Sequence, residues 1–475
     1  MKKFIFPALF AFLFVFASCM NMSGSSGESG SVRVVLPGSA RYSFSQDKAD
    51  KFVVTISSGS KLVDEKTEFS GGVIEFDELN PGDYTIEAKA FDSDNDLVVG
   101  WGIADATVEK GENTDCSLSL QPVVSAFDSA PSYKKLVVLS SADMTKLCEL
   151  VNAGSDFEGI TITLADDVDL ADCADDWQPI GYIKSITADD SDVDNMPFKG
   201  TFNGNGKTIS YNITKREDGL GSQMFGLFFD NYGTIENLIV NQTCSGDLSD
   251  RGMSRGGMIC VYNYGSIKNC IVKADIAIGT KSDTAGICKV NTESGKVVNC
   301  FSTGNIENQF TFNWNGSYQK TGGICCINHG TVENAVTAVQ IKTNSVIDTS
   351  TQLSYISGAI AARTDSYLKN CYWLKDNINR AGITYNQISY ISETGAYTDE
   401  NCIPDPSRIT GCGYFDTNSP SASVVAGTVS ECKSEQTLAY SGTLIDMLNA
   451  YVSASSDSGL KKWQAGADGS LALSF

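Results

Sequence analysis

Cysteines are the side chains in this 475-residue sequence with the widest choice of chemistry, and there are fifteen of them. A thiol can form a disulfide, bind a metal or pack as a small apolar group. Six of them recur at two positions of an internal repeat: Cys260, Cys288 and Cys325 at one, Cys270, Cys300 and Cys371 at the other. The other repeats hold apolar residues at these positions, namely Leu227, Leu238, Ala335 and Ile360. We therefore expect six free, buried thiols, with disulfides as the alternative in a chain that carries an export signal.

The remaining sulfur and imidazole chemistry is limited. Cys402, Cys412 and Cys432 fall in irregular sequence and could pair as disulfides. The single histidine, His329, stands where other repeats have turn residues, and no C-x₂-C pair is followed by a second one. Zinc sites need such ligands, so we expect no metal and no cofactor.

Carboxylates form two clusters that could serve a polysaccharide lyase or glycosidase, whose chemistry needs acidic side chains on one face. The clusters are Asp166, Asp167 and Asp169, then Asp189, Asp190, Asp192 and Asp194. The first lies at a strand end. The second is typical of a solvated loop, and the alternative is that residues 189–194 bind calcium. Within the repeats, we expect almost no Asp, Glu, Arg or His at equivalent positions of successive units, with Arg363 and Asp365 the only close pair.

Aromatic residues alternate in the longest excursion between repeats. They are Phe310, Phe312, Trp314 and Tyr318. Exposed rings of this kind could stack on sugars or seat a protein partner, which makes the segment a candidate ligand-binding site. The alternative is that the rings pack on the flank of the fold as an extra strand. Tyr385, Tyr390 and Tyr397 form a second, weaker cluster.

These residues are positioned by a five-fold repeat with a period of 30 to 36 residues. Its marker is an asparagine at Asn237, Asn269, Asn299, Asn334 and Asn370. Short, alternating runs rich in Ile, Val and Cys predict strands, so we expect an all-β, right-handed parallel β-helix with three strands per coil. Stacked asparagines can hydrogen-bond from coil to coil as a structural ladder. The glycines four residues earlier, Gly233, Gly265, Gly295 and Gly330, predict turns with positive φ.

The repeat resembles the GLUG-repeat family of bacterial surface proteins, in which Gly-rich runs precede GxIxNC-like units. The segments LADDVDLADCADDWQPIG (Leu164–Gly181) and FKGTFNGNGKTIS (Phe198–Ser210) resemble the opening of such β-helices. The resemblance implies a capping helix over residues 140–154, which Ser141 could start, and a closing segment over residues 433–475 that covers the other end. The β-helix would then span residues 135–475.

The N-terminus has the pattern of a secretory signal over residues 1–18, with Lys2 and Lys3 before an apolar run. Ala17-Ser18-Cys19 resembles a lipobox, which implies acylation of Cys19, although Phe16 stands where leucine is usual. Cleavage without acylation is the alternative. Residues 19–31 are Ser- and Gly-rich and predict a flexible tether. Residues 32–122 resemble prealbumin-like or carboxypeptidase-regulatory-like β-sandwich modules, with a turn at Asn80–Tyr84. Residues 123–134 are expected to be a linker.

Charge narrows the range of partners. The formal net charge of −22 repels nucleic acid, so we expect none as a partner. We expect a monomer held by its acyl anchor in the outer membrane, at the cell surface, since Met20 is not the inner-membrane-retaining Asp. The resulting hypothesis is a non-catalytic scaffold for adhesion or for binding a protein or glycan. A polysaccharide-degrading enzyme on the same scaffold is the alternative.

Overall fold

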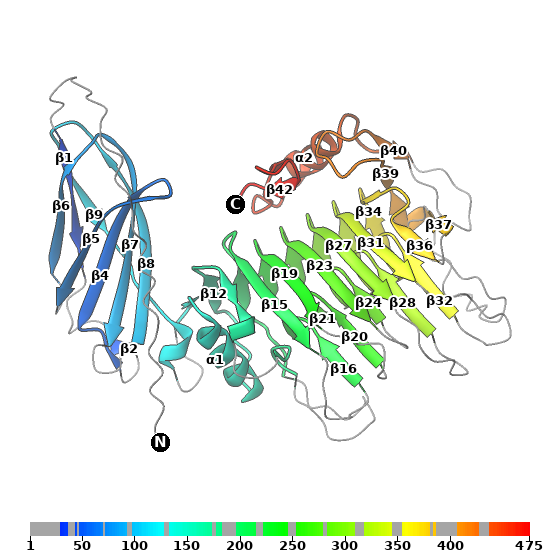
Figure 1. Cartoon of the computed structure of the whole chain (residues 1–475), viewed down its shortest axis with the longest axis horizontal. Helices are drawn as coiled ribbons and strands as arrows, with labels where there is room; N and C mark the ends of the chain where they lie inside the picture. The colour runs from blue at the N-terminus through cyan, green and yellow to red at the C-terminus, as the bar shows by residue number, and fades with distance from the viewer. Residues whose placement is uncertain are drawn as a thin grey trace, which may run out of the picture.

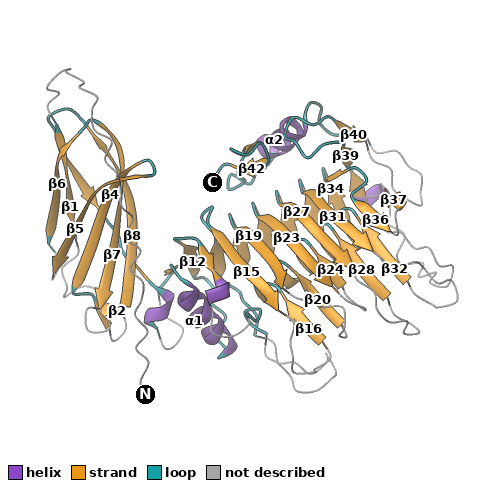
Figure 2. Ribbon diagram, viewed as in Figure 1, coloured by secondary structure: helices purple, strands orange, loops and turns teal. Residues whose placement is uncertain are grey.

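A β-sandwich followed by a parallel β-helix makes up the structure (Figures 1 and 2). The computed structural model describes residues 29–36, 43–44, 47–69, 72–92, 97–127, 133–172, 177–182, 196–214, 222–245, 253–278, 283–308, 318–343, 354–380, 383–385, 406–426 and 437–475. The signal 1–18, Cys19 and most of the tether lie outside these residues.

The sandwich has two sheets with alternating buried and exposed residues, as expected for strands that pack on one face. One sheet has the order β6-β1-β9: β1 (Gly30–Val35), β6 (Val73–Leu79) and β9 (Asn113–Ser117). The other has the order β10-β8-β7-β4-β5: β4 (Lys51–Ser58), β5 (Lys61–Phe69), β7 (Gly82–Asp92), β8 (Leu97–Val108) and β10 (Gln121–Pro122). The pair β2 (Ser43–Phe44) and β3 (Asp47–Lys48) forms a small hairpin.

The predicted linker differs from expectation. Val123, Val124 and Phe127 are buried, and η2 (Val124–Ala126) packs beside α1. Val123 also bridges to Val137 of the β-helix, and Trp101 of β8 packs on that same Val137. Because these apolar side chains continue the hydrophobic core, the sandwich is joined to the β-helix by packed residues rather than by free chain.

Four parallel sheets form the walls of the β-helix (Figure 1). The first contains β11 (Lys135–Val138), β12 (Thr161–Leu164), β14 (Thr201–Asn203), β18 (Thr234–Glu236), β22 (Ser266–Lys268), β26 (Lys296–Val298), β30 (Thr331–Glu333), β34 (Tyr367–Lys369) and β38 (Ile409–Thr410). The second contains β13 (Val168–Asp169), β15 (Thr208–Thr214), β19 (Ile239–Ser245), β23 (Ile271–Ile278), β27 (Phe301–Asn308), β31 (Val336–Thr343), β35 (Tyr372–Leu374), β39 (Gly413–Phe415) and the antiparallel β40 (Val424–Ala426), with β36 (Ile378–Arg380) and β37 (Ile383–Tyr385) at its side.

The third and fourth sheets are narrower. The β16–β32 sheet contains β16 (Ser222–Phe225), β20 (Met253–Gly257), β24 (Asp283–Ala285), β28 (Tyr318–Gly322) and β32 (Ser354–Gly358). The β17–β33 sheet contains β17 (Phe228–Asn231), β21 (Cys260–Asn263), β25 (Cys288–Asn291), β29 (Cys325–Asn328) and β33 (Ala361–Thr364). A full coil therefore has four strands, not the three predicted.

The asparagine that recurs in each repeat accounts for the extra strand, because the chain bends at this residue. Asn237 has φ 55°, and the equivalent asparagines share this left-handed conformation, so the chain bends between β18 and β19. The four glycines predicted to have positive φ do not have it; that prediction is wrong. They are needed because coils approach closely: a Cβ on Gly265 would lie 2.0 Å from the Gly233 carbonyl oxygen.

Two asparagine ladders run along the stack. In the first, Nδ2 of Asn237, Asn269, Asn299 and Asn334 each donates to the Oδ1 one coil earlier, over 2.8 to 3.1 Å, beginning at Asn203. Asn370 shares the φ of 50°, but within the described part of the chain Asn334 Oδ1 accepts no hydrogen bond. The second ladder was not predicted; it runs from Asn231 through Asn263, Asn291 and Asn328 to Thr364.

Thiols fill the core between these ladders, and the ten cysteines that the structure describes are all free. In the register, Cys260, Cys288 and Cys325 stack between Phe228 and Ala361, one residue from the counterparts predicted. The second column includes Cys270, Cys300 and Cys371. Cys412 extends it as a fully buried core residue rather than a loop residue. Cys402 and Cys432 lie outside the described residues.

Two helices accompany the stack. α1 (Ser141–Asn152) caps its N-terminal end and buries Met144, Leu147 and Val151. Its N-cap is Ser140, not Ser141, in a capping box with Asp143. The second helix, α2 (Leu444–Ala454), is capped by Thr443 and Asp446. Short 3₁₀ turns occur at η3 (Leu170–Asp172) and η5 (Pro406–Arg408).

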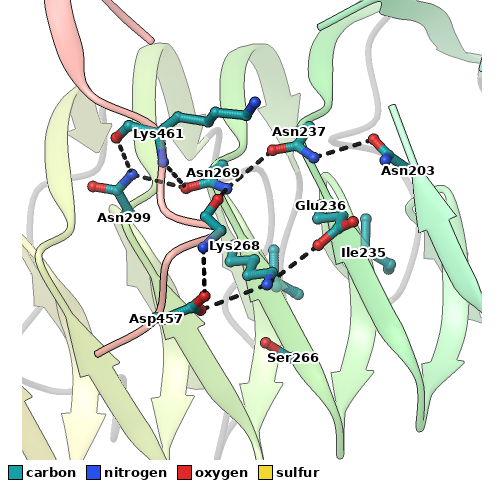
Figure 3. Close-up of polar contacts among 12 residues, drawn as sticks. Asn203, Ile235, Glu236, Asn237, Ser266, Lys268, Asn269, Asn299, Asp457 and Lys461 are labelled. Carbon is teal, nitrogen blue, oxygen red and sulfur yellow. Dashed lines mark hydrogen bonds and ion pairs between the residues drawn. The ribbon is translucent and has the colours of Figure 1, made fainter. Parts of the chain in front are cut away.

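The C-terminal segment does not simply close the far end of the stack, as was expected. α2 packs on Phe301, Val336 and Tyr372, which lie on β27, β31 and β35. Residues 455–475, here called the C-terminal strap, then run back along the first ladder (Figures 1 and 3). The strap carries β41 (Trp463–Ala465) and β42 (Leu471–Leu473), and its last residue, Phe475, lies against Gly206 near the first coil.

Candidate functional site

Charged and aromatic side chains gather on the outer face where the β16–β32 and β17–β33 sheets meet. Because both sheets are parallel and in register, equivalent residues of successive coils form columns. Met224, Arg255, Asp283 and Lys320 form one such column on β16, β20, β24 and β28. The next residue of β16, Phe225, belongs to the interior core. By the alternation of a strand, the column that contains Met224 therefore faces outward.

The neighbouring sheet supplies a second outward column. Phe229, Val261, Lys289 and Cys326 each follow a core residue of β17, β21, β25 or β29. Met224, Phe229 and Val261 pack together in a cluster of their own, separate from the interior core. Together with Tyr182 and Tyr262, the side chains of these two columns are called the outer strip below.

Three aromatic rings lie at the N-terminal end of the outer strip. Tyr182 stacks on Phe229 with ring centroids 4.9 Å apart, and Phe229 meets Tyr262 edge-on at 5.7 Å. The Lys289 ammonium follows, 4.8 Å from the centre of the Tyr262 ring and 3.1 Å from its hydroxyl oxygen. This order places apolar ring surface next to a cation.

A charge cluster occupies the next two coils. Lys320 Nζ is 3.7 Å from Asp283 Oδ1, and the Cys326 thiol donates to the Lys320 carbonyl oxygen over 3.4 Å. Burial raises the pKa of Cys326; Asp283 raises it further, while Lys320 and Lys289 lower it.

Lys289 is the most deeply buried of these charges, with 4% of its surface exposed. Its hydrogen bond goes to the neutral Tyr262 hydroxyl, and no carboxylate of the described residues lies within ion-pair distance of it. Burying a charge is costly unless an opposite charge balances it. Asp283 is 7% exposed, and its Oδ1 accepts no hydrogen bond from the described residues.

The outer strip contradicts the expectation that Asp, Glu, Arg and His hardly recur on successive coils, because Arg255 and Asp283 are paired in one column. Lys320 follows in that column, and Lys289 lies in the neighbouring one. The sequence contained a signal for this site: Lys289 interrupts the apolar run TAGICKV, where the equivalent residues are the apolar Phe229, Val261, Cys326 and Ala362. The signal was missed because strand alternation alone did not place Lys289 and Asp283 on the same face.

A second acid lies beside the outer strip. Asp230 pairs in register with Tyr262, and burial raises its pKa to about 6. Its Oδ1 accepts no hydrogen bond from the described residues. Asp230 is therefore a carboxyl group that is partly protonated just below neutral pH.

The predicted aromatic segment leads into the outer strip. Tyr318 is the first residue of β28, two residues before Lys320, and pairs with Ser354. Phe310, Phe312 and Trp314 lie outside the described residues. Of the weaker cluster, Tyr385 is the last residue of β37, while Tyr390 and Tyr397 lie outside the described part.

The other predicted groups have structural partners. Asp166, Asp167 and Asp169 accept backbone N–H bonds, among them Thr208 N to Asp167 over 2.7 Å. His329 Nδ1 lies 2.7 Å from Asp365 on the next coil. The acidic segment 189–194 lies outside the described residues. Within the ranges that the structure describes, no group of three metal-binding side chains was found, and no helix is long and apolar enough to cross a membrane.

The first ladder meets the C-terminal strap through its remaining hydrogen bonds (Figure 3). Asn269 donates to the Gly459 carbonyl over 2.9 Å and accepts from Lys461 N over 3.1 Å. Asn299 donates to the Lys461 carbonyl over 2.9 Å, and Trp463 Nε1 donates to Asn299 Oδ1 over 2.6 Å. Asp457 reaches Lys268, which also pairs with Glu236. These asparagines therefore bind a segment of the chain, and we assign them a structural role.

Comparisons with known proteins add little to these observations. No protein-family model matches the chain, and no curated protein matches it. Among solved structures, the pectate lyase PelI from Erwinia chrysanthemi is 12% identical, over 80% of this chain and 99% of its own, with a TM-score of 0.17. The pectate lyase Pel3 from Pectobacterium carotovorum is 10% identical, over 81% of this chain and 99% of its own, with a TM-score of 0.12. Likenesses this weak carry no argument about activity.

Proposed function

We propose that this chain is an exported, non-catalytic binding protein that captures a glycan on the outer strip of its β-helix. The supporting observation is the row of rings Tyr182, Phe229 and Tyr262 that ends in the buried Lys289. Aromatic faces pack against the apolar faces of sugar rings, and charged groups fix orientation.

Binding is favoured over catalysis by the kind of side chain present. Glycosidases use a pair of carboxylic acids about 5–10 Å apart, one to donate a proton and one to attack or activate water. The two columns of the outer strip contain Arg255, Lys289 and Lys320 but one carboxylate, Asp283, and this is paired with Lys320. A site rich in cations and rings suits recognition better than proton transfer.

The proposed location is the cell surface, by acylation of Cys19 in the outer membrane. Residues 19–31 would hold the fold away from the lipid. Labelling cells with a radioactive fatty acid tests the anchor: we expect label on the wild type and none on Cys19→Ala. Protease added to intact cells should then degrade the protein. Full protection, with a periplasmic marker protected as well, would place it inside the envelope.

Glycan binding is tested with a glycan array probed by the mature chain, purified with Cys19→Ser to prevent acylation. We expect a defined set of glycans to bind, and Tyr262→Ala to weaken binding at least tenfold. The matched control is Tyr232→Ala, because Tyr232 is an exposed tyrosine that stacks on Tyr264 outside the outer strip, whereas Tyr262 is half-buried. Equal loss in both variants, or binding of no glycan at all, would reject the proposal.

A further inference from the structure

Strand β5 is an open edge of the β-sandwich. It ends the five-stranded sheet, and within the described part of the chain it pairs only with β4. The opposite edge of that sheet is β10, next to the point where Val123 bridges to Val137 of the β-helix. Three strands separate β5 from β10, so the β-helix lies at the other edge of the sheet. An edge of this kind presents a row of backbone N–H and C=O groups to a partner strand.

No side chain of β5 is buried, whereas alternate side chains of β4 are. The sheet that faces these strands has three strands rather than five, so β5 lies at its rim. Lys66 reaches across to β6, where its ammonium donates to the Glu75 carbonyl oxygen and lies 5.2 Å from the centre of the Phe76 ring. Phe69, at the end of β5, is 61% exposed. β5 is therefore held mainly by backbone hydrogen bonds along one side, and a strand on its free side would add a second row of them.

The second half of β5 is the regular part of this edge. A β-bulge lies opposite Ile56 and Ser57, where Val63 is the extra residue of β5. Bulges of this kind interrupt pairing at the edges of sheets. From Glu65 to Phe69, each residue pairs with one residue of β4 in unbroken register. Residues Glu65–Phe69 are called the edge segment below.

The edge segment, Glu-Lys-Thr-Glu-Phe, is complementary to a second copy of itself in one register. Residues directly opposite in an antiparallel pair share a face, so a two-fold axis between identical strands must pass through a residue. An axis at any of the three charged residues would place a like charge opposite itself. An axis at Phe69, the last residue of the strand, would leave most of the segment unpaired. An axis at Thr67 places Lys66 opposite Glu68 on both sides and Thr67 opposite itself, and both kinds of pair are favourable.

From these observations we infer that two copies of this chain associate by antiparallel pairing of their β5 strands about Thr67, which joins their five-stranded sheets into one. The occupant of the edge is a second copy because the edge segment complements itself, and its Lys66 and Glu68 side chains are half-exposed and within reach of a partner strand. In the dimer, Glu65 lies opposite the exposed ring of Phe69. The interface is separate from the outer strip, so the inference goes beyond the proposed function and does not depend on it. The sequence predicted a monomer, and a dimer would replace that prediction.

The association is tested by analytical ultracentrifugation of the full mature chain, again with Cys19→Ser, over a range of protein concentrations. We expect a monomer–dimer equilibrium. Lys66→Glu turns both Lys–Glu pairs into like-charge pairs and should weaken dimerisation at least tenfold. The double variant Lys66→Glu, Glu68→Lys restores both pairs with their charges exchanged and should recover most of the affinity. Lys61→Glu makes the same change of charge at an exposed position in the bulged half of β5 and should change nothing.

Cross-linking tests the register. In a dimer that carries Thr67→Cys, the two new thiols face each other across the axis, so oxidation by diamide should link the chains by a disulfide. Glu65→Cys lies opposite Phe69 and should be linked no more than the wild type, whose own cysteines set the background. The inference is overturned if the chain is monomeric at every concentration, if the double variant does not recover, or if position 65 is linked instead of position 67. Because the double variant also lacks the Lys66 contact to Phe76, its recovery would separate loss of the interface from any change in folding.

Discussion

Replacing Asn299 is expected to destabilise the β-helix and loosen the C-terminal strap together. The side chain of Asn299 is fully buried and takes part in four hydrogen bonds. Two of these join the ladder, to Asn269 and Asn334, and two join the strap, to the Lys461 carbonyl and to Trp463 Nε1. The backbone has φ 57°, a conformation that alanine adopts at a cost and glycine without one.

The two variants Asn299→Gly and Asn299→Ala separate these contributions. Both leave the Lys461 carbonyl and Trp463 Nε1 without the partner they have in the wild type. Each unsatisfied buried group costs about 1–3 kcal/mol, so Asn299→Gly should lower the free energy of unfolding by about 2–6 kcal/mol. Asn299→Ala should cost roughly 1–2 kcal/mol more, because it also strains the backbone. Asn241→Ala, at an exposed position of β19, is the matched control and should stay within about 0.5 kcal/mol of the wild type.

Urea denaturation measures these differences, and limited trypsin digestion reports on the strap. Lys461 and Lys462 are tryptic sites within the strap, so mass spectrometry should detect faster cleavage there in Asn299→Gly than in Asn241→Ala. The reasoning is refuted if Asn299→Gly unfolds at the same urea concentration as the wild type and its strap is cut no faster. Loss of stability without faster cleavage would confine the role of Asn299 to the ladder.

Three further predictions concern the Asp230 carboxyl group, the close contact between coils at Gly265, and the thiols. Burial raises the folded-state pKa of Asp230 to about 6, so wild-type stability falls as the pH rises from 4 through 6. At pH 8, the free energy of unfolding of Asp230→Asn should therefore exceed that of the wild type by at most roughly 3 kcal/mol. At pH 4 the two proteins should be equally stable in urea titrations. Gly265→Ala would place a Cβ 2.0 Å from a carbonyl oxygen, so it should lower the melting temperature far more than Gly59→Ala, whose Cβ would meet nothing within 4 Å and whose cost is limited to its φ of 57°. Of the ten described thiols, the partly exposed Cys148 should react with a thiol reagent before the others, and equally fast reaction of the buried ones would contradict their place in the core.

The β-helix could be predicted because its signals are periodic. Asn and Cys at fixed steps predict stacked coils, since equivalent residues must meet in a parallel sheet. The sequence could not show that Asn237 has the left-handed φ and that Gly265 is needed where two coils approach closely. Both residue types are common in turns, and both recur with the same period, so the repeat does not show which one has positive φ. We predicted positive φ at the glycine, whereas the structure has it at the asparagine.

The candidate site was harder to predict than the scaffold. Its residues come from two sheets that meet at a corner, where simple alternation no longer decides which side chains share a face. Lys289 and Asp283 are six positions apart in the sequence, on β25 and β24, and belong to two different sheets because the chain turns between these strands. The strap left even less trace in the sequence, since its contacts to the ladder are made largely by backbone groups.

The C-terminal strap changes the order in which this molecule can reach its final state. A solenoid whose coils touch only their neighbours can fold progressively as it emerges from a translocation pore, N-terminus first. Here position 475 lies against position 206, so the strap, which follows every coil in the sequence, contacts the start of the stack. That contact has a very long sequence separation, which makes it an intrinsically slow closing step. If the chain is exported as proposed, docking of the strap is the step that completes folding, and variants that lack the strap should leave the first ladder uncovered.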